Sequence, residues 1–174
     1  ATVYSIVRKH DGDVFCESVL DEGTVFTVLL PATRDEPASI ESNGTGTLRG
    51  EGRVLVMDDE AVVRTVAHRM LTSLGYRPVC CASGEEALVQ YKEGFDSGDP
   101  FDCVILDLTV PGGMGGEEAL RALQDIDPNV KTIVSSGYAD VPAIADPTAY
   151  GFQAAVSKPY NIQRLGTAVQ DVLT

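Results

Sequence analysis

Two spacings of apolar residues alternate along residues 53–174, and each predicts one kind of element. Short apolar runs rich in β-branched residues are typical of strands buried on both faces of a sheet. Apolar residues three and four positions apart predict helices that cover such a sheet. The expected strands are 53–57, 77–81, 103–107, 131–135 and 154–157. The expected helices are about 60–74, 84–93, 115–125 and 161–172, with a short or irregular one in 138–152, where Pro142 and Pro147 break the pattern.

Local signals mark two of the helix ends. Gly75 follows the first of these helices, where a left-handed C-terminal residue belongs. Ser83 precedes the second helix with Glu86 three residues later, which is the pattern of a capping box. Five strands separated by helical segments predict an α/β fold with a doubly wound parallel sheet and right-handed crossovers.

Residues 1–33 show a different and shorter pattern. It predicts a helix over 1–10 and two strands, 13–19 and 24–30, joined by a turn. A helix and a hairpin are too small to bury a core of their own, so we interpret this piece as the end of a domain whose beginning is missing. Residues 34–52 hold one Ile and one Leu among polar residues and glycines, which predicts a flexible linker before a domain over 53–174.

Composition narrows the class of partner. The 174 residues carry a formal net charge of −13, which argues against nucleic acid as a direct partner because phosphate binding needs clustered Lys and Arg. No apolar run approaches the roughly 20 residues of a membrane-spanning helix, so no membrane contact is expected for this segment. The cysteines lack metal-ligand spacing, and we expect reduced core residues of a cytoplasmic protein. They are Cys16, Cys80, Cys81 and Cys103.

Polar side chains follow several of the expected strands. Asp58 and Asp59 come after 53–57, Asp107 ends 103–107, and Ser136 and Lys158 follow the last two strands. Because the carboxyl ends of parallel strands meet at one edge of a sheet, we expect these groups to lie close together. Two carboxylates about 4 Å apart repel by about 4 kcal/mol at an effective dielectric constant near 20, so the cluster favours a divalent cation. Oxygen ligands with room for water suit Mg²⁺.

Each residue alone has a plainer interpretation. An aspartate after a strand commonly caps the next helix, and a lysine before a proline is commonly an exposed strand end. Their coincidence at one sheet edge is what indicates a site. His10 and His68 lack the helical His-Glu or His-Asp context of a kinase phosphodonor, and we expect both to be surface or packing residues.

Four motifs carry a family resemblance. They are VMDDE at 56–60, LDLTVPG at 106–112, SSGY at 135–138 and KP at 158–159. With them, residues 53–174 resemble the receiver domain of two-component response regulators, which has a flavodoxin-like fold with a five-stranded parallel sheet. The resemblance implies a phosphorelay role, in which a phosphohistidine transfers its phosphoryl group to the receiver.

The resemblance also implies a role for each site residue. Asp107 is the phosphorylation site. Asp59, Asp107 and the main-chain carbonyl of Thr109 bind Mg²⁺, with Asp58 acting through water. Lys158 neutralises phosphoryl charge and Ser136 donates a hydrogen bond to the phosphoryl group. A cis peptide bond is expected between Lys158 and Pro159.

The N-terminal piece has a resemblance of its own. Residues 1–12 (ATVYSIVRKHDG) and 23–31 (GTVFTVLLP) resemble the last helix and hairpin of the ATP-binding domain of sensor histidine kinases. This order of parts is that of a hybrid histidine kinase, and it implies a kinase phosphohistidine domain or a histidine phosphotransfer protein as partner; a homodimer is compatible with it. The family's Asn-bearing helix and Gly-rich nucleotide lid are not among residues 1–33, so no kinase activity is expected of this chain by itself.

Two other functions stay open at this point. A phosphatase of the haloacid-dehalogenase type also uses a strand-end aspartate and Mg²⁺, but it needs a second aspartate two positions later, where this chain has Thr109. An interaction module with a vestigial pocket is opposed by the retention of all the acidic, hydroxyl and amine groups. One position departs from the receiver pattern: an aromatic residue is common three places before the lysine, and here it is Ala155.

Overall fold

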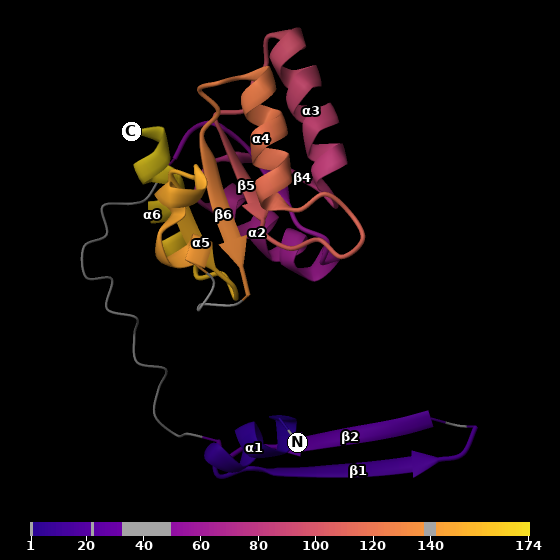
Figure 1. The fold of residues 1–174 in the computed structure, drawn as a ribbon. Coiled ribbons are helices and arrows are strands. Elements are labelled where there is room, and N and C mark those ends of the chain that lie inside the picture. Colours follow the sequence, from indigo (N-terminus) through magenta and orange to yellow (C-terminus); the bar gives the residue numbers. More distant parts are fainter. Residues whose placement is uncertain (1, 22, 33–49, 138–141) are drawn as a thin grey trace. The chain divides into compact units, whose positions relative to one another are not determined.

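The computed structural model describes residues 2–21, 23–32, 50–137 and 142–174 (Figure 1). The chain divides into two compact units, Ala1–Thr45 and Gly46–Thr174, which are described separately. Most of the expected linker, 34–52, lies outside the described residues, as do Tyr138, the last residue of the SSGY motif, and residues 139–141.

The second unit is built on a five-stranded sheet in which all neighbouring strands are parallel. The strand order is β4-β3-β5-β6-β7, so the chain winds outward from the middle in both directions. The expected doubly wound α/β fold is confirmed. The strands are β3 (Arg53–Met57), β4 (Arg77–Cys81), β5 (Cys103–Asp107), β6 (Thr132–Ser136) and β7 (Ala154–Ser157).

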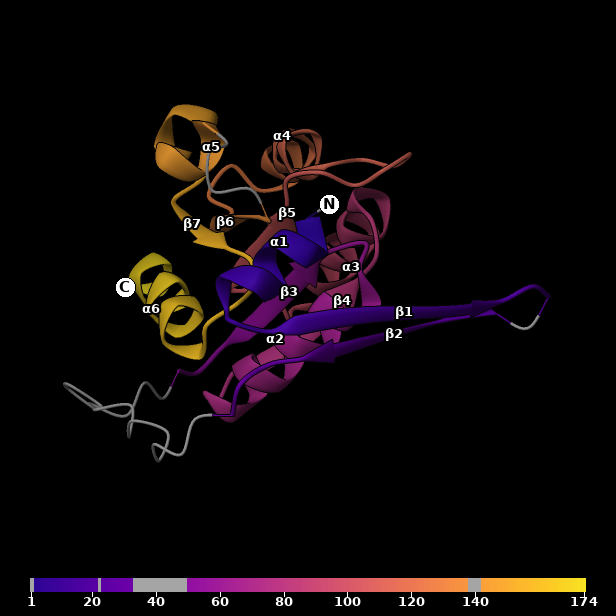
Figure 2. The same cartoon turned by 90° about the horizontal axis from the view of Figure 1, so that it is seen from below.

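Helices cover both faces of this sheet (Figure 2). Two helices, α2 (Ala61–Ser73) and α6 (Ile162–Leu173), pack on one face, where alternate strand residues such as Val56 and Ile105 form the core. The opposite face, with Leu55 and Leu106, is covered by three helices. These are α3 (Gly84–Ser97), α4 (Gly116–Ile126) and α5 (Pro142–Ala145). Helix α5 and the 3₁₀ turn η1 (Pro147–Tyr150) are the short elements expected within 138–152.

The helix-end signals are largely confirmed. Gly75 has a φ of 95°, and the Tyr76 N–H that follows donates to the Leu71 carbonyl at 3.0 Å. The Ser83 hydroxyl accepts from the Glu86 N–H at 3.4 Å. The Glu86 carboxylate accepts from the N–H of Ala82, at 2.8 Å, rather than from that of Ser83 as a regular capping box would have it.

Helix α3 extends four residues beyond the expected end at 93, and Gly94 is the reason. A Cβ at Gly94 would lie 2.8 Å from a guanidinium nitrogen of Arg53 and 3.4 Å from the Phe101 ring. The glycine therefore serves close packing inside the helix, and it does not end it. The helix stops at Gly98, which has a φ of 76°.

The first unit contains α1 (Thr2–Lys9) and an antiparallel hairpin of β1 (Asp13–Val19) and β2 (Gly23–Leu29). Nearly all described side chains of the hairpin are exposed, Cys16 among them. The expectation of a core cysteine is wrong at Cys16, because the described part of this unit, one short helix and a hairpin, is too small to bury it. Cys81 and Cys103 are buried, and all four cysteines are free thiols. No helix in the described ranges is long and apolar enough to cross a membrane.

Two neighbouring serines end β6, and the first of them is structural. Ser135 is fully buried, and its hydroxyl lies 2.8 Å from the hydroxyl of Tyr160, a member of the core between the sheet and α2 and α6. Burial raises the pKa of Tyr160 to about 12, so its hydroxyl stays protonated at neutral pH. Ser136, the next residue, points to the other face by strand alternation. The peptide bond between Lys158 and Pro159 is cis, as expected.

The Ser135–Tyr160 pair generates a stability prediction. We expect Tyr160→Phe to lower the free energy of unfolding by about 1–3 kcal/mol, because it leaves the Ser135 hydroxyl buried without this partner. Ser135→Ala should act similarly through the stranded Tyr160 hydroxyl. The double variant should lose less than the sum of the two, as measured by urea unfolding; additive losses would contradict the pairing. Tyr150→Phe, at a tyrosine that is 39% exposed, is the control and should stay within about 0.5 kcal/mol.

Candidate functional site

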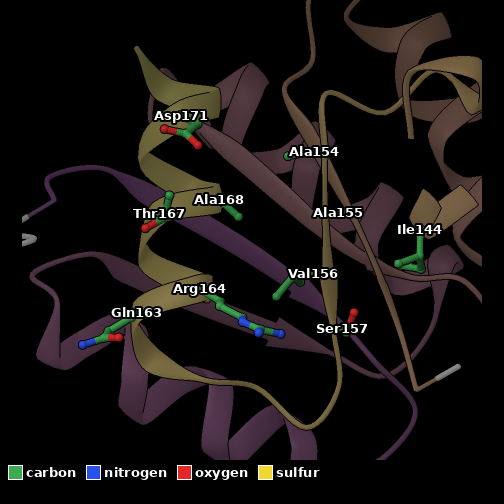
Figure 3. A pocket seen from close by; sticks show the side chains of 10 residues that line it. All are labelled: Ile144, Ala154, Ala155, Val156, Ser157, Gln163, Arg164, Thr167, Ala168 and Asp171. Carbon is green, nitrogen blue, oxygen red and sulfur yellow. The ribbon is translucent and has the colours of Figure 1, made fainter. Parts of the chain in front are cut away.

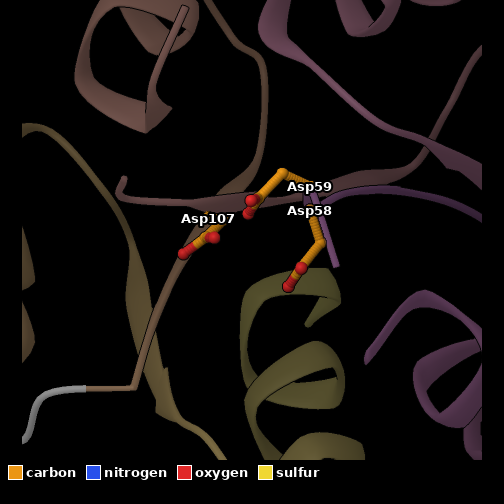
Figure 4. A group of neighbouring side chains, drawn as sticks. All are labelled: Asp58, Asp59 and Asp107. Atoms are coloured by element: carbon orange, nitrogen blue, oxygen red, sulfur yellow. The ribbon is translucent and has the colours of Figure 1, made fainter. Parts of the chain in front are cut away.

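The carboxyl ends of β3 and β5 bring three aspartates together (Figure 4). The two strands are neighbours, with Met57 paired to Leu106, so Asp58, Asp59 and Asp107 emerge at the same edge. One carboxylate oxygen from each lies within 4.8 Å of those from the other two. Asp58 is fully buried, Asp107 is 6% exposed and Asp59 is exposed, so the cluster opens to solvent on the Asp59 side.

Lys158 provides the positive charge inside this cluster. Its Nζ lies 2.6 Å from Oδ2 of Asp58 and 2.9 Å from Oδ2 of Asp107, and its side chain is 11% exposed. Burial alone would lower the pKa of Lys158, but the hydrogen bonds to the two carboxylates outweigh it and raise the pKa above 10.5. Lys158 therefore stays charged at neutral pH, and its contribution to stability is lost as the pH rises through that raised pKa.

The negative charge of the Asp107 carboxylate is only partly compensated by its surroundings. Burial raises its pKa above 3.8, and the negative charge of Asp58 adds to that effect. Lys158 and the backbone N–H of Thr109 act in the opposite direction without cancelling it. The ionised carboxylate would therefore gain from further positive charge nearby.

The loop that follows Asp107 is fastened at its far end to helix α3. The Gly84 N–H donates to the Met114 carbonyl at 3.2 Å, and the Met114 N–H donates to the Glu85 carboxylate at 3.1 Å. A Cβ at Gly84 would lie 2.7 Å from the Met114 side chain, so only glycine allows this approach. At the near end of the loop, the Leu108 N–H donates to the Ser135 carbonyl at 2.9 Å. Both ends of the segment after Asp107 are thus held in place.

The remaining expected residues lie at the same sheet edge. Ser136 is 3% exposed at the end of β6, and its carbonyl accepts from the Lys158 N–H at 2.8 Å. Thr109 is exposed and approaches Asp107 through its N–H; the role of its carbonyl as a metal ligand stays a prediction. His10 and His68 are both exposed.

Two residues of this region were missed by the sequence analysis, Glu85 and Arg64. The Arg64 guanidinium donates from Nη1 to the main-chain carbonyls of Asp58 and Asp59. Contacts from a side chain to a main chain leave no periodic signal. The only hint at the sequence level is the charge of each residue near the start of a helix.

Ala155, where receivers commonly have an aromatic residue, is half-buried on β7. It lines a groove of about 490 Å³ that runs along this strand and α6 (Figure 3). A methyl group cannot change its position by side-chain rotation, so this position cannot act as a rotating switch.

The ion pairs of Lys158 generate a second prediction. Lys158→Ala leaves Asp58 fully buried without its cation, and we expect the free energy of unfolding of the metal-free protein to fall by about 3–5 kcal/mol. The matched control is Lys92, an exposed lysine of α3. Lys92→Ala should change the free energy of unfolding by less than about 0.5 kcal/mol. If the two variants lose equal free energy of unfolding in urea, the buried ion pairs of Lys158 do not stabilise the fold.

Comparisons with known proteins agree with this geometry. The sequence profile of the response regulator receiver domain matches residues 54–170. The chain is 32% identical to the sensor kinase CckA of Brucella abortus over 98% of its own length, but it spans only 19% of that kinase. It is also 32% identical to the chemotaxis protein CheY of Thermotoga maritima, over 69% of this chain and 96% of that protein.

A solved structure shows the same fold. The crystal structure of a CheX-CheY-BeF3-Mg²⁺ complex from Borrelia burgdorferi matches with a TM-score of 0.63 and 27% identity, over 71% of this chain and 90% of the matched chain. The five-stranded sheet is therefore of the flavodoxin-like receiver type. From the profile match and these similarities it follows that the chain belongs to the family of response regulator receiver domains.

Proposed function

We propose that residues 53–174 accept a phosphoryl group on Asp107, in a Mg²⁺-dependent reaction, from a phosphohistidine. The observation that carries this proposal is the environment of Asp107, a nearly buried carboxylate 2.9 Å from Lys158 and within reach of two further carboxylates. A carboxylate so placed is both a nucleophile and part of a cation site.

The residues present fit a magnesium ion. Three carboxylates within 4.8 Å form an all-oxygen donor set, and one side of it is open to solvent. Asp59, Asp107 and the Thr109 carbonyl would hold the ion, and Asp58 would act through water. The bound ion would neutralise charge on the phosphoryl oxygens. The Borrelia relative, whose structure is described with Mg²⁺ and BeF3, supports this assignment.

The protein's own groups would carry the transfer. A carboxylate oxygen of Asp107 attacks phosphorus, an acyl phosphate bond forms, and the bond from phosphorus to the histidine nitrogen breaks with its electron pair left on the imidazole. The Lys158 ammonium, already beside Asp107, neutralises negative charge on the transferred group, and the Ser136 hydroxyl donates a hydrogen bond to it. These roles need positioning and charge, and no proton has to leave Lys158.

We also propose a division of the chain that follows from the hybrid-kinase resemblance. Residues 1–33 would be the C-terminal part of a histidine-kinase ATP-binding domain, 34–52 a linker, and 53–174 the receiver. The alignment with the sensor kinase covers 98% of the chain and so extends beyond the receiver match at 54–170, which supports this order. The phosphodonor would be a kinase phosphohistidine domain or a histidine phosphotransfer protein, acting in the cytoplasm, where ATP is available.

Mass spectrometry after incubation with acetyl phosphate and Mg²⁺ tests the proposal. We expect one added phosphate, lost in EDTA and in Asp107→Asn, because the amide is not a nucleophile for phosphorus. Asp125→Asn, at an exposed aspartate of α4, is the matched control and should label like the unchanged protein.

Other outcomes identify the alternatives. Continuous release of phosphate at a constant rate, without a stable label, would indicate a phosphatase. Absence of both label and release would indicate a vestigial module. Full labelling of Asp107→Asn, mapped to His10 or His68, would refute the assignment of the nucleophile.

A further inference from the structure

We propose that Arg64 is a positioning residue that holds Asp59 in metal-binding geometry before a cation arrives. This inference rests on the proposed function, since it concerns the same acidic cluster. It assigns a role to a residue that belongs neither to the cluster nor to the motifs from which the cluster was predicted.

The contacts of Arg64 are made to the main chain of the loop between β3 and α2. Its Nη1 lies 2.6 Å from the carbonyl oxygen of Asp58 and 2.8 Å from that of Asp59. These two carbonyls belong to the peptide units on either side of the Asp59 α-carbon. When both peptide planes are fixed, the direction in which the Asp59 side chain leaves the backbone is fixed as well.

Asp58 does not depend on Arg64 to the same extent. Its N–H donates to the Cys81 carbonyl at 3.2 Å, its Oδ1 accepts from the Glu60 N–H at 2.9 Å, and its Oδ2 contacts Lys158. Asp59 is exposed, and within the described residues no hydrogen bond of its carboxylate is found. Among the described residues, Asp59 is held by the hydrogen bond that its main-chain carbonyl accepts from Arg64.

Helix stabilisation does not explain the position of Arg64. It is the fourth residue of α2, near the helix N-terminus, where the helix dipole disfavours a cation. The first turn contains no acidic residue that would compensate, and Glu60 makes no side-chain cap. The half-buried guanidinium is satisfied instead by the two carbonyls, which is what a role in holding the loop requires.

Two roles of Arg64 predict opposite effects on Mg²⁺ binding. If Arg64 acted only through its charge, it would repel Mg²⁺, and its removal would tighten binding. If it positions Asp59, its removal allows the Asp59 carboxylate to move away from the carboxylates of Asp58 and Asp107, which repel it, and Mg²⁺ binding weakens. The sign of the change in affinity therefore separates the two.

The experiment is a Mg²⁺ titration of the full chain, followed by amide chemical shifts. We expect Arg64→Ala to bind Mg²⁺ about 10-fold more weakly, since loss of a group that orients a metal ligand typically has an effect of this size. Arg64→Lys keeps a donor and should bind with intermediate affinity. Arg69→Ala removes the same charge from an exposed position of the same helix and should bind as the unchanged protein does, or slightly more tightly.

Phosphorylation by acetyl phosphate provides a second readout. At saturating Mg²⁺, Arg64→Ala should label at nearly the rate of the unchanged protein, because the ion then holds Asp59 itself. Circular dichroism checks that each variant is folded. If Arg64→Ala does not fold, the Mg²⁺ affinity of Arg64→Lys provides the test.

Three results would overturn the inference. They are equal or tighter Mg²⁺ binding by Arg64→Ala, equal weakening by Arg69→Ala, and slow labelling of Arg64→Ala that saturating Mg²⁺ does not restore. If the unchanged protein shows no Mg²⁺-dependent shifts at all, the proposed function fails together with the inference, and this outcome is distinct from the other three.

Discussion

Buried negative charge is the constraint on which the arrangement of this sheet edge depends. A carboxylate as buried as that of Asp58 is strongly unfavourable unless a cation accompanies it, and Lys158 is that cation. The lysine directly follows β7, which is separated from β5 by β6, and its long side chain spans the distance. The strand order and the position of Lys158 directly after β7 therefore bring the cation to the acidic pair that follows β3.

The sequence predicted β3 and β5 well because strands buried on both faces leave a continuous apolar run. Four strands have the expected bounds, and β6 is displaced by one residue because its end is polar, at Ser135 and Ser136. Helix α3 was predicted too short: it continues through Gly94, where the missing side chain makes room for Arg53 and Phe101. Propensity cannot register a contact with a distant part of the chain.

Some residues of the site could also be predicted from the sequence, and others could not. Asp58, Asp59, Asp107 and Lys158 could be predicted to converge because each stands at a strand end, and parallel topology brings strand ends together. Arg64 and Glu85 could not, because their partners are main-chain groups of loops whose path depends on the folded structure. Ser135 and Ser136 show both cases in one dipeptide: alternation predicts that they face opposite sides, but not that the first would find Tyr160.

The tie between Met114 and the start of α3 has a consequence for insertions and deletions. Exposed loops usually accept extra residues, because nothing fixes their length. Here one residue, Met114, both donates to Glu85 and accepts from Gly84, while Asp107 anchors the other end at the sheet. One residue more or less between 108 and 113 would move one of these anchors out of reach. This surface segment is therefore held to a fixed length, as buried strands are.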